Sequence, residues 1–401
     1  MALFSDTLHD FKTATLRGGP GFFRVGQTHS GQWWLLDPEG RPFFARAVHG
    51  VQARVEALHD PAARLRAWGF NTLGGGSDRL YFEEGLAFLT AVDFCTGDGL
   101  IQLGGVRLPD VFAAEWPERA HARAAEVCPP LAEQRELIGW LTDDQPRWPL
   151  APAAARPGLL QTCLSLEPSL AAYHAAWEFA LALHGGRLET LAKAWGVVLP
   201  NKAALRELTR SEQGILSRGH LRDDARWAQE FARRYFGPAT AAIRAHDPNH
   251  LVLGCRWQGP AGAALRAACL PPLVDVRLLD FTELADEPAV AAGPALVVDF
   301  SWVTEEFYGA PPGRRMRGLT AVERMLRRGR LALGRAVAQP AVVGYAWSHW
   351  ADRAGEQPPF ASGLVHGNDA EAREHTELLT EINQRVEELR SVATVIMDEI
   401  A

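Results

Sequence analysis

Eight short apolar runs, separated mostly by helix-like segments, are the feature that most constrains the fold of this chain. The intervening segments show the apolar spacing of amphipathic helices, as in "PAARLRAWG" and "RLETLAKAWG". "LGGGSD", residues 73–78, lacks the lysine of a P-loop and the third glycine of a dinucleotide-binding turn. The pattern therefore predicts a (β/α)₈ TIM barrel rather than a doubly wound sheet. The runs begin near residues 43, 70, 86, 137, 251, 273, 295 and 342.

Two departures from a plain barrel are expected. "GFFRV" and "QWWLL" read as a short N-terminal β-hairpin that precedes the first barrel strand. Residues 149–224 are too many for one crossover and contain helical "SLAAYHAAWEFALALHGG", which predicts a helical insertion after the fourth strand. No repeat or low-complexity linker divides the chain, so we expect residues 1–401 to form a single domain.

Composition excludes several classes of function. The formal net charge of -7 argues against a nucleic-acid surface, which needs clustered Lys and Arg. No window approaches the length of a membrane span, and the first twenty residues lack the apolar core of a signal peptide, so we expect a cytoplasmic protein. The 13 histidines contain no HExxH or HxH pair, and the five cysteines are scattered, so no metal site is predicted.

Polar residues at the ends of the predicted strands are the candidate site, because a barrel assembles its chemistry at the carboxyl ends of its strands. An isolated Asp there is also compatible with a helix cap. Asp299 differs because it interrupts the apolar run "PALVVDFSW", where a buried carboxylate needs a partner such as Arg256. Trp347 is compatible with core packing or with a flat face for a sugar ring. The strand-end residues are His49, Asn71, Asp78, Asp143, Asp144, Gln145, Arg256, Asp280, Asp299, Ser301, Trp347 and His349.

Motifs along nearly the whole chain resemble a known family. These include "GQWWLLDPEGRPFFARAVHGV", "RLRAWGFNTLGGGSD", "ELIGWLTDDQPRW", "YFGPATAAIRAHDPNHLVLGCRW", "ALVVDFSW" and "VVGYAWSHWAD". In number and order they resemble the β-agarase and β-galactosidase-like members of glycoside hydrolase clan A, which are retaining (β/α)₈ glycosidases. The resemblance implies a carbohydrate ligand and no metal or organic cofactor. It leaves the oligomeric state open.

The resemblance also assigns roles to residues. In such enzymes the fourth strand ends in Asp-Asn-Glu, whose Glu is the general acid/base, and the seventh strand ends in a Glu nucleophile. The matching positions here are Asp143, Asp144 and Gln145, and Asp299, so both glutamates are replaced. Gln145 cannot deliver a proton, and Asp299 is one methylene shorter than the family residue. Arg256, Phe281 and Trp347 match or nearly match substrate-site positions of the family, whereas Gly75 and Gly76 stand where relatives tend to carry Asn and Trp.

Two hypotheses follow for the function. In the first, the chain is an active glycosidase in which Asp144 replaces the lost acid and Asp299 is the nucleophile or general base. In the second, it is a pseudo-glycosidase that binds carbohydrate or a protein partner through the cleft inherited from such enzymes. A positioned general acid contributes about 10²- to 10⁴-fold to the rate, so its loss weakens hydrolysis of ordinary glycosides without abolishing it.

Overall fold

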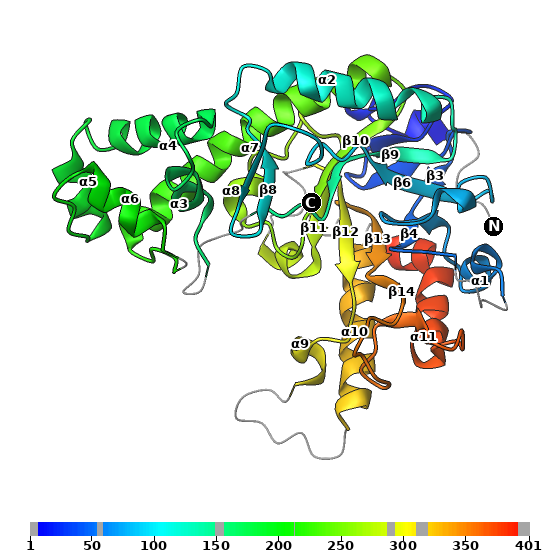
Figure 1. Cartoon of the computed structure of the whole chain (residues 1–401). Coiled ribbons are helices and arrows are strands. Elements are labelled where there is room, and N and C mark those ends of the chain that lie inside the picture. The colour runs from blue at the N-terminus through cyan, green and yellow to red at the C-terminus, as the bar shows by residue number, and fades with distance from the viewer. Residues whose placement is uncertain are drawn as a thin grey trace.

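The predicted apolar runs form one sheet of eight strands, all paired in parallel, which curls into a nearly closed barrel (Figure 1). A computed structural model describes residues 7–53, 59–148, 156–211, 213–286, 293–309 and 320–391. The sheet order is β10-β9-β6-β5-β4-β13-β12-β11. The (β/α)₈ prediction is confirmed. The barrel strands are β4 Ala45–Val48, β5 Thr72–Leu73, β6 Ala87–Ala91, β9 Leu137–Asp144, β10 Leu251–Arg256, β11 Arg277–Asp280, β12 Ala295–Phe300 and β13 Val342–Trp347.

The two edge strands meet at a seam held by one side chain. The backbone N–H of Asp275 donates to the carbonyl of Val252 at 2.7 Å, and the Asp275 carboxylate accepts from the N–H of Val252 at 2.9 Å. An aspartate thereby supplies the acceptor that a ladder carbonyl provides elsewhere in the sheet. The barrel closes at this point without a regular β10–β11 ladder among the described residues.

Helices surround the barrel, and α2 and α7 lie along one side of it while α10 and α11 lie together on another (Figure 1). Four helices, α3 to α6, fall between β9 and α7 and gather near one end of α7, which is the predicted insertion after the fourth strand. Residues 149–155 and 212 of that insertion lie outside the described residues. The helices are α1 Pro61–Ala67, α2 Trp116–Val127, α3 Leu159–Leu164, α4 Ala171–Ala182, α5 Leu188–Trp195, α6 Lys202–Thr209, α7 Arg218–His246, α8 Ala263–Arg266, α9 Glu305–Tyr308, α10 Ala321–Ala338 and α11 Arg373–Gln384.

Local chemistry fixes where these helices begin and end. The Asp60 carboxylate caps α1 by accepting from the N–H groups of Ala62 and Ala63, both at 3.0 Å, and Pro61 occupies the first helical turn. Thr320 and Glu323 form a capping box at the start of α10. None of the helices within the described ranges is long and apolar enough to cross a membrane.

The N-terminal element differs from the predicted hairpin. It is a three-stranded antiparallel sheet of β1 Arg24–Gln27, β2 Trp33–Leu36 and β3 Pro42–Phe43. Phe43, expected to begin the first barrel strand, pairs with Leu35 instead, and the barrel strand starts at Ala45. The turn at residues 37–40 brings the chain straight back onto β2, which an alternating apolar pattern alone does not reveal. Two small pairs complete the strands, β7 Leu100–Leu103 with β8 Val106–Pro109 and β14 His349–Ala351 with β15 Gly363–Val365.

The N-terminal sheet also packs against the barrel interior. Inward-facing aliphatic side chains of the barrel strands, such as Leu253 and Val343, form one buried cluster with Val25 and Trp33 of this sheet. The backbone N–H of Trp33 donates to the carbonyl of Pro340, just before β13, at 2.8 Å. The small sheet therefore covers the amino ends of the barrel strands and leaves the carboxyl ends for a site.

Arg390 fastens this sheet to the C-terminal part of the chain. Its side chain is fully buried and donates to the carbonyls of Trp33, Val337 and Val342. The guanidinium carbon lies 4.1 Å from the centre of the Trp34 ring, and burial lowers the pKa of Arg390 to about 9. One side chain thus satisfies carbonyls from the N-terminal sheet, the end of α10 and β13.

We expect Arg390→Met to lower the free energy of unfolding by about 2 kcal/mol or more, because it keeps most of the side-chain volume but leaves buried carbonyls unpaired. Urea denaturation measures this change. The matched control is Arg385→Met, because the half-exposed Arg385 pairs with Glu388 at 3.0 Å and such pairs contribute about 1 kcal/mol or less. Equal effects of the two substitutions would show that Arg390 does not fasten the sheet.

Candidate active site

The carboxyl ends of three barrel strands bring together two carboxylates and one guanidinium. Asp144 ends β9, Arg256 ends β10, and Asp299 lies near the end of β12. The three residues are separated widely in sequence but share the end of the barrel at which such enzymes place their chemistry. The side chains of Asp144 and Asp299 keep 17% and 19% of their surface exposed, so a ligand can reach them.

Arg256 binds both carboxylates at once. Its Nε and Nη2 donate to the two carboxylate oxygens of Asp299 at 3.1 and 2.8 Å, and its Nη1 donates to Asp144 Oδ1 at 2.5 Å. The Arg256 side chain is almost completely buried, at 5% exposed. A guanidinium in this position compensates the cost of burying two like charges, as the sequence predicted for Asp299 and Arg256.

The pKa values of the two carboxyl groups are shifted in opposite directions from their usual range. Burial raises the pKa of Asp144 despite the opposing charge of Arg256. Burial also acts to raise the pKa of Asp299, but the charge and hydrogen bonds of Arg256 act against it and hold that pKa below its usual value, and the charge of His49 adds to this only at low pH, where its ring is protonated. Because His49 is neutral near pH 7, Arg256 is the cation that keeps Asp299 ionised. Asp144 is thereby the better proton donor and Asp299 the better base.

Two residues of the site have strained backbones. Gln145 and Asp299 have φ of 53° and 54°, in the left-handed region that costs a residue with a side chain on the order of 1 kcal/mol. The N–H of Gln145 donates to the carbonyl of Arg256 at 2.8 Å, which holds the turn after β9 against β10. Both strained residues are among the candidates that the sequence resemblance suggested for catalysis. The half-buried Gln145 side chain makes no hydrogen bond to the described residues.

The glycines after β5 make room for Asp144. A Cβ atom on Gly75 would lie 2.7 Å from Asp144 Oδ2, and one on Gly76 would lie 3.6 Å from the same atom. The first distance is too short for a real contact, so the Asp144 carboxylate occupies space that a side chain at Gly75 would need. Glycine at position 75 therefore allows the Asp144 carboxylate to lie where it does.

Two neutral histidines border the carboxylates. His49 follows β4 and is fully buried, and burial lowers its pKa to about 3. Apart from a weak contact with the Gly75 backbone, neither ring nitrogen has a hydrogen-bond partner in the part of the chain that the structure describes. His349 begins β14, and burial lowers its pKa to about 4. Both rings are uncharged near pH 7, and only the half-buried His349 is exposed enough to bind a sugar hydroxyl.

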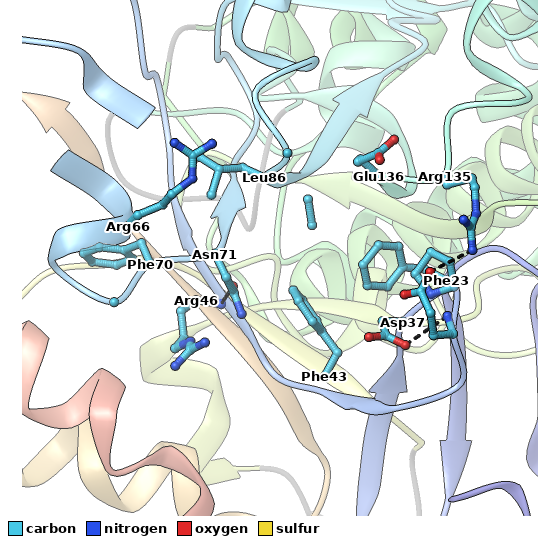
Figure 2. A pocket seen from close by; sticks show the side chains of 15 residues that line it. Phe23, Asp37, Phe43, Arg46, Arg66, Phe70, Asn71, Leu86, Arg135 and Glu136 are labelled. Atoms are coloured by element: carbon cyan, nitrogen blue, oxygen red, sulfur yellow. Dashed lines mark hydrogen bonds and ion pairs between the residues drawn. The ribbon is translucent and has the colours of Figure 1, made fainter. Parts of the chain in front are cut away.

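Asn71 is not brought to this site. It precedes β5 at the amino end of the barrel, where its side chain accepts from the N–H of Arg46 at 2.8 Å and donates to the carbonyl of Phe44 at 3.0 Å. It lines a cavity of about 480 Å³ together with Arg135 and Glu136, at the opposite end from Arg256 (Figure 2). Asn71 therefore has a structural role, since its polar atoms join two barrel strands.

Asp143 and Trp347 point away from a ligand at the barrel mouth. Asp143 accepts from the backbone N–H of Cys95 at 2.8 Å and from the hydroxyl of Tyr235, on the helical side of β9. Trp347 is fully buried, donates to the carbonyl of Ser362 at 2.8 Å and packs against Trp302 with ring centres 4.7 Å apart. No ring face of Trp347 is open to a sugar in this structure, so the core-packing interpretation describes it.

The sixth-strand candidates are also engaged locally. The Asp280 carboxylate accepts from the N–H and hydroxyl of Thr282, at 2.9 and 2.5 Å. Phe281 packs against Phe300 and Phe307, with ring centres 4.9 and 5.9 Å away. Both residues shape the wall next to β12, and their contacts here are to neighbouring residues rather than to Asp144 or Arg256.

Asp93 is a site residue that the sequence reading missed. It follows β6 with φ of 60°, and its charge is among those that raise the pKa of Asp144. The sequence pattern that could have identified it is "AVDFC" at 91–95, which matches "VVDFS" at 297–301: in both, an Asp interrupts an apolar run at a strand end.

Among the described residues no group of three or more His, Cys, Asp or Glu side chains is placed to hold a metal ion.

Comparisons with known proteins point to carbohydrate-active enzymes. No family model matches the chain. It is 24% identical to β-agarase A of Vibrio sp. (strain JT0107) over 304 residues, which are 71% of this chain and 30% of that protein. It is also 24% identical to β-agarase B of the same organism over 219 residues, which are 53% of this chain and 23% of that protein. The chain thus spans less than a third of the length of these relatives.

Solved structures share the fold. BpGH50 matches with a TM-score of 0.67 and 14% identity, covering 97% of this chain and 87% of that one. An exo-β-agarase matches with a TM-score of 0.65 and 16% identity, covering 96% of this chain and 68% of that one. The sequence likeness to β-agarases and the shared barrel together support a relationship with glycoside hydrolases.

The buried carboxyl group of Asp143 should make the free energy of unfolding depend on pH. Burial raises its pKa to about 7, so between about pH 4 and pH 7 the folded protein holds a proton that the unfolded chain releases. The contribution of Asp143 to stability is complete below its unfolded pKa and is lost as the pH rises through its folded pKa. We expect Asp143→Asn to flatten the fall in unfolding free energy over this range by about 2 kcal/mol.

Urea denaturation at pH 4.5, 6 and 7.5 measures this effect. Asp224, whose pKa burial also raises to about 7, should contribute a second and separate part of the fall. Asp98→Asn, at an exposed carboxylate, is the matched control. An unchanged pH profile in Asp143→Asn would contradict the assignment.

Proposed function

We propose that this chain is a glycoside hydrolase that acts on a β-linked, galactan-type oligosaccharide, with Asp144 as general acid and Asp299 as the partnering carboxylate. The observation that carries the proposal is geometric: two carboxyl groups at the barrel mouth share one buried arginine, Asp299 through both oxygens and Asp144 through one. The opposite directions in which their pKa values shift agree with this arrangement. Environments that push two such groups apart are how one site supplies both an acid and a base. The relationship with β-agarases supports the substrate class.

The proposed roles follow from the contacts. Asp144 delivers its proton to the glycosidic oxygen, since Gln145 has no proton to give. Asp299 acts as nucleophile or as base toward water. Both oxygens of Asp299 accept from Arg256, and each oxygen keeps a second lone pair that can meet the substrate or a water molecule. Gln145 donates to a sugar hydroxyl, and neutral His349 binds another.

Activated aryl glycosides separate the two roles. Dinitrophenolate leaves without protonation, so a lost acid does not prevent its release. We expect the protein to release dinitrophenolate from the β-galactoside, and Asp299→Asn to lower kcat/KM by about 10²-fold or more. Asp144→Asn should keep dinitrophenolate release but lower cleavage of a natural β-linked oligosaccharide by about 10²- to 10⁴-fold. Gln145→Glu should not raise either rate.

The pH profile gives an independent check on the same protein. Cleavage of the natural oligosaccharide should fall at low pH as Asp299 becomes protonated, and at high pH as Asp144 loses its proton. The high-pH limb should disappear for the dinitrophenyl substrate, because that reaction does not use Asp144. Full activity of Asp144→Asn on the oligosaccharide would contradict the acid role, and full activity of Asp299→Asn on either substrate would contradict the base role.

The contacts of Arg256 also support a second candidate function. Arg256 holds Asp299 in a two-point ion pair and binds Asp144 as well, and such a network also suits carboxylates that organise a binding surface. In that case the chain is a pseudo-glycosidase that binds carbohydrate or a protein partner. An inert wild type, together with an active Gln145→Glu/Asp299→Glu variant, would favour this second function. Turnover by the wild type, abolished in Asp299→Asn, would exclude it.

A further inference from the structure

A second cavity lies beside the candidate site, between the β7–β8 hairpin and the insertion helices. Its volume is about 840 Å³, within the range of pockets that hold small ligands. The walls come from the turn at 103–106, the chain after β9, the α3 region and the end of α6. The lining includes the side chains of Arg147, Trp148, Glu167, Arg210 and Gln258.

The cavity adjoins the candidate site through two short chain segments. Arg147 follows Gln145 by two residues, and its carbonyl accepts from the N–H of Arg107 on β8 at 3.1 Å. Trp148 packs edge-on against Trp257, with ring centres 5.1 Å apart, and Trp257 follows Arg256 directly. A chain of sugar units bound across Asp144 and Asp299 can therefore extend over this cavity.

The lining of the cavity carries an excess of positive charge. It contains three arginines, namely 147, 156 and 210, and a single carboxylate, Glu167, although the whole protein has a formal net charge of -7. Glu167 is shared between Arg206 and Arg210, with N–O distances of 3.2 and 3.1 Å. Arg147 has no carboxylate within ion-pair distance among residues 7–53, 59–148, 156–211, 213–286, 293–309 and 320–391.

An unpaired donor lies in the same wall. Trp148 is only 6% exposed, and its indole N–H has no hydrogen-bond partner in the described part of the chain. Buried indole N–H groups normally have an acceptor, so an acceptor on a bound ligand fits this position. Gln258 is exposed at the edge of the cavity and offers an amide to a hydroxyl.

We propose that this cavity is a subsite for an anionic sugar unit, one that carries a sulfate ester or a carboxylate, of the oligosaccharide that the protein binds. The proposal rests on the proposed function in that the ligand is a β-linked oligosaccharide. Arg147 and Arg210 supply planar donor pairs that match sulfate and carboxylate oxygens. The indole N–H of Trp148 and the amide of Gln258 bind the oxygens of the same ring. The substrate class is therefore an acidic galactan rather than a neutral one.

Calorimetric titration of the full chain tests the proposal with three galactan-type tetrasaccharides: a neutral one, one with a single sulfate ester, and one with a single uronate. We expect at least one charged tetrasaccharide to bind about tenfold more tightly than the neutral one. Arg147→Gln and Arg210→Gln should each reduce that preference by about tenfold, and raising the salt from about 50 to 300 mM should reduce it too. The stronger of the two charged ligands identifies the anion.

Arg66→Gln is the matched control, since Arg66 lines the cavity at the opposite end of the barrel, and it should leave all three affinities unchanged. Equal binding of neutral and charged tetrasaccharides would overturn the proposal, as would a preference that survives both arginine substitutions or a failure of both charged ligands to bind. Chromatography of the recovered tetrasaccharides reports cleavage separately. If no tetrasaccharide is cleaved but a charged one still binds in a way that depends on the two arginines, the proposed hydrolase activity is contradicted and the proposed subsite is not.

Discussion

The guanidinium of Arg256, placed between two buried carboxylates, is the interaction on which the site depends. Without it, Asp144 and Asp299 would bring two like charges into a poorly solvated barrel end, and at least one would have to take up a proton. With it, one positive charge lies between the two groups: Asp299 has both oxygens on Arg256 while Asp144 has one. Burial raises the pKa of Asp144, and Arg256 helps to hold that of Asp299 low.

The barrel maintains this arrangement at a cost in backbone strain. The left-handed conformations of Asp93, Gln145 and Asp299 all fall where a strand ends at the site. The ladders of β10 with β9 and of β12 with β13 shift register at these ends, which turns side chains that would otherwise alternate. Packing elsewhere in the fold offsets this cost. The N-terminal sheet fills the amino end of the barrel, and Arg390 binds that sheet to α10 and β13.

The barrel was predictable from the sequence because its strands are short apolar runs that mostly alternate with helix-like segments. The charged pair Arg256–Asp299 was predictable for a related reason, since an acid inside an apolar strand requires a partner. Other features depend on which side of a strand a residue faces, which a bulge or a left-handed residue changes without altering the apolar pattern. Asp143 and Trp347 therefore turned out to face helices and core, and Asn71 lies at the amino end of its strand. The pairing of Phe43 with β2 depends on a turn rather than on periodicity.

The position of the Asp144 carboxylate at the end of β9 is linked to the residue at position 75. An Asp144 carboxylate directed at β5 requires that residue 75 have no side chain, and that residue is a glycine. A site that had only decayed would not be expected to match the position of its acid to the shape of the neighbouring strand end. Gly75→Ala moves the Asp144 carboxylate without removing it, so the proposed acid role requires a lower rate on natural oligosaccharides and an unchanged rate on dinitrophenyl glycosides. If Asp144 had only a structural role, Gly75→Ala would change the free energy of unfolding and neither of the two rates. The coupling between residues 75 and 144 is therefore the physical reason to favour a reorganised hydrolase over an abandoned one.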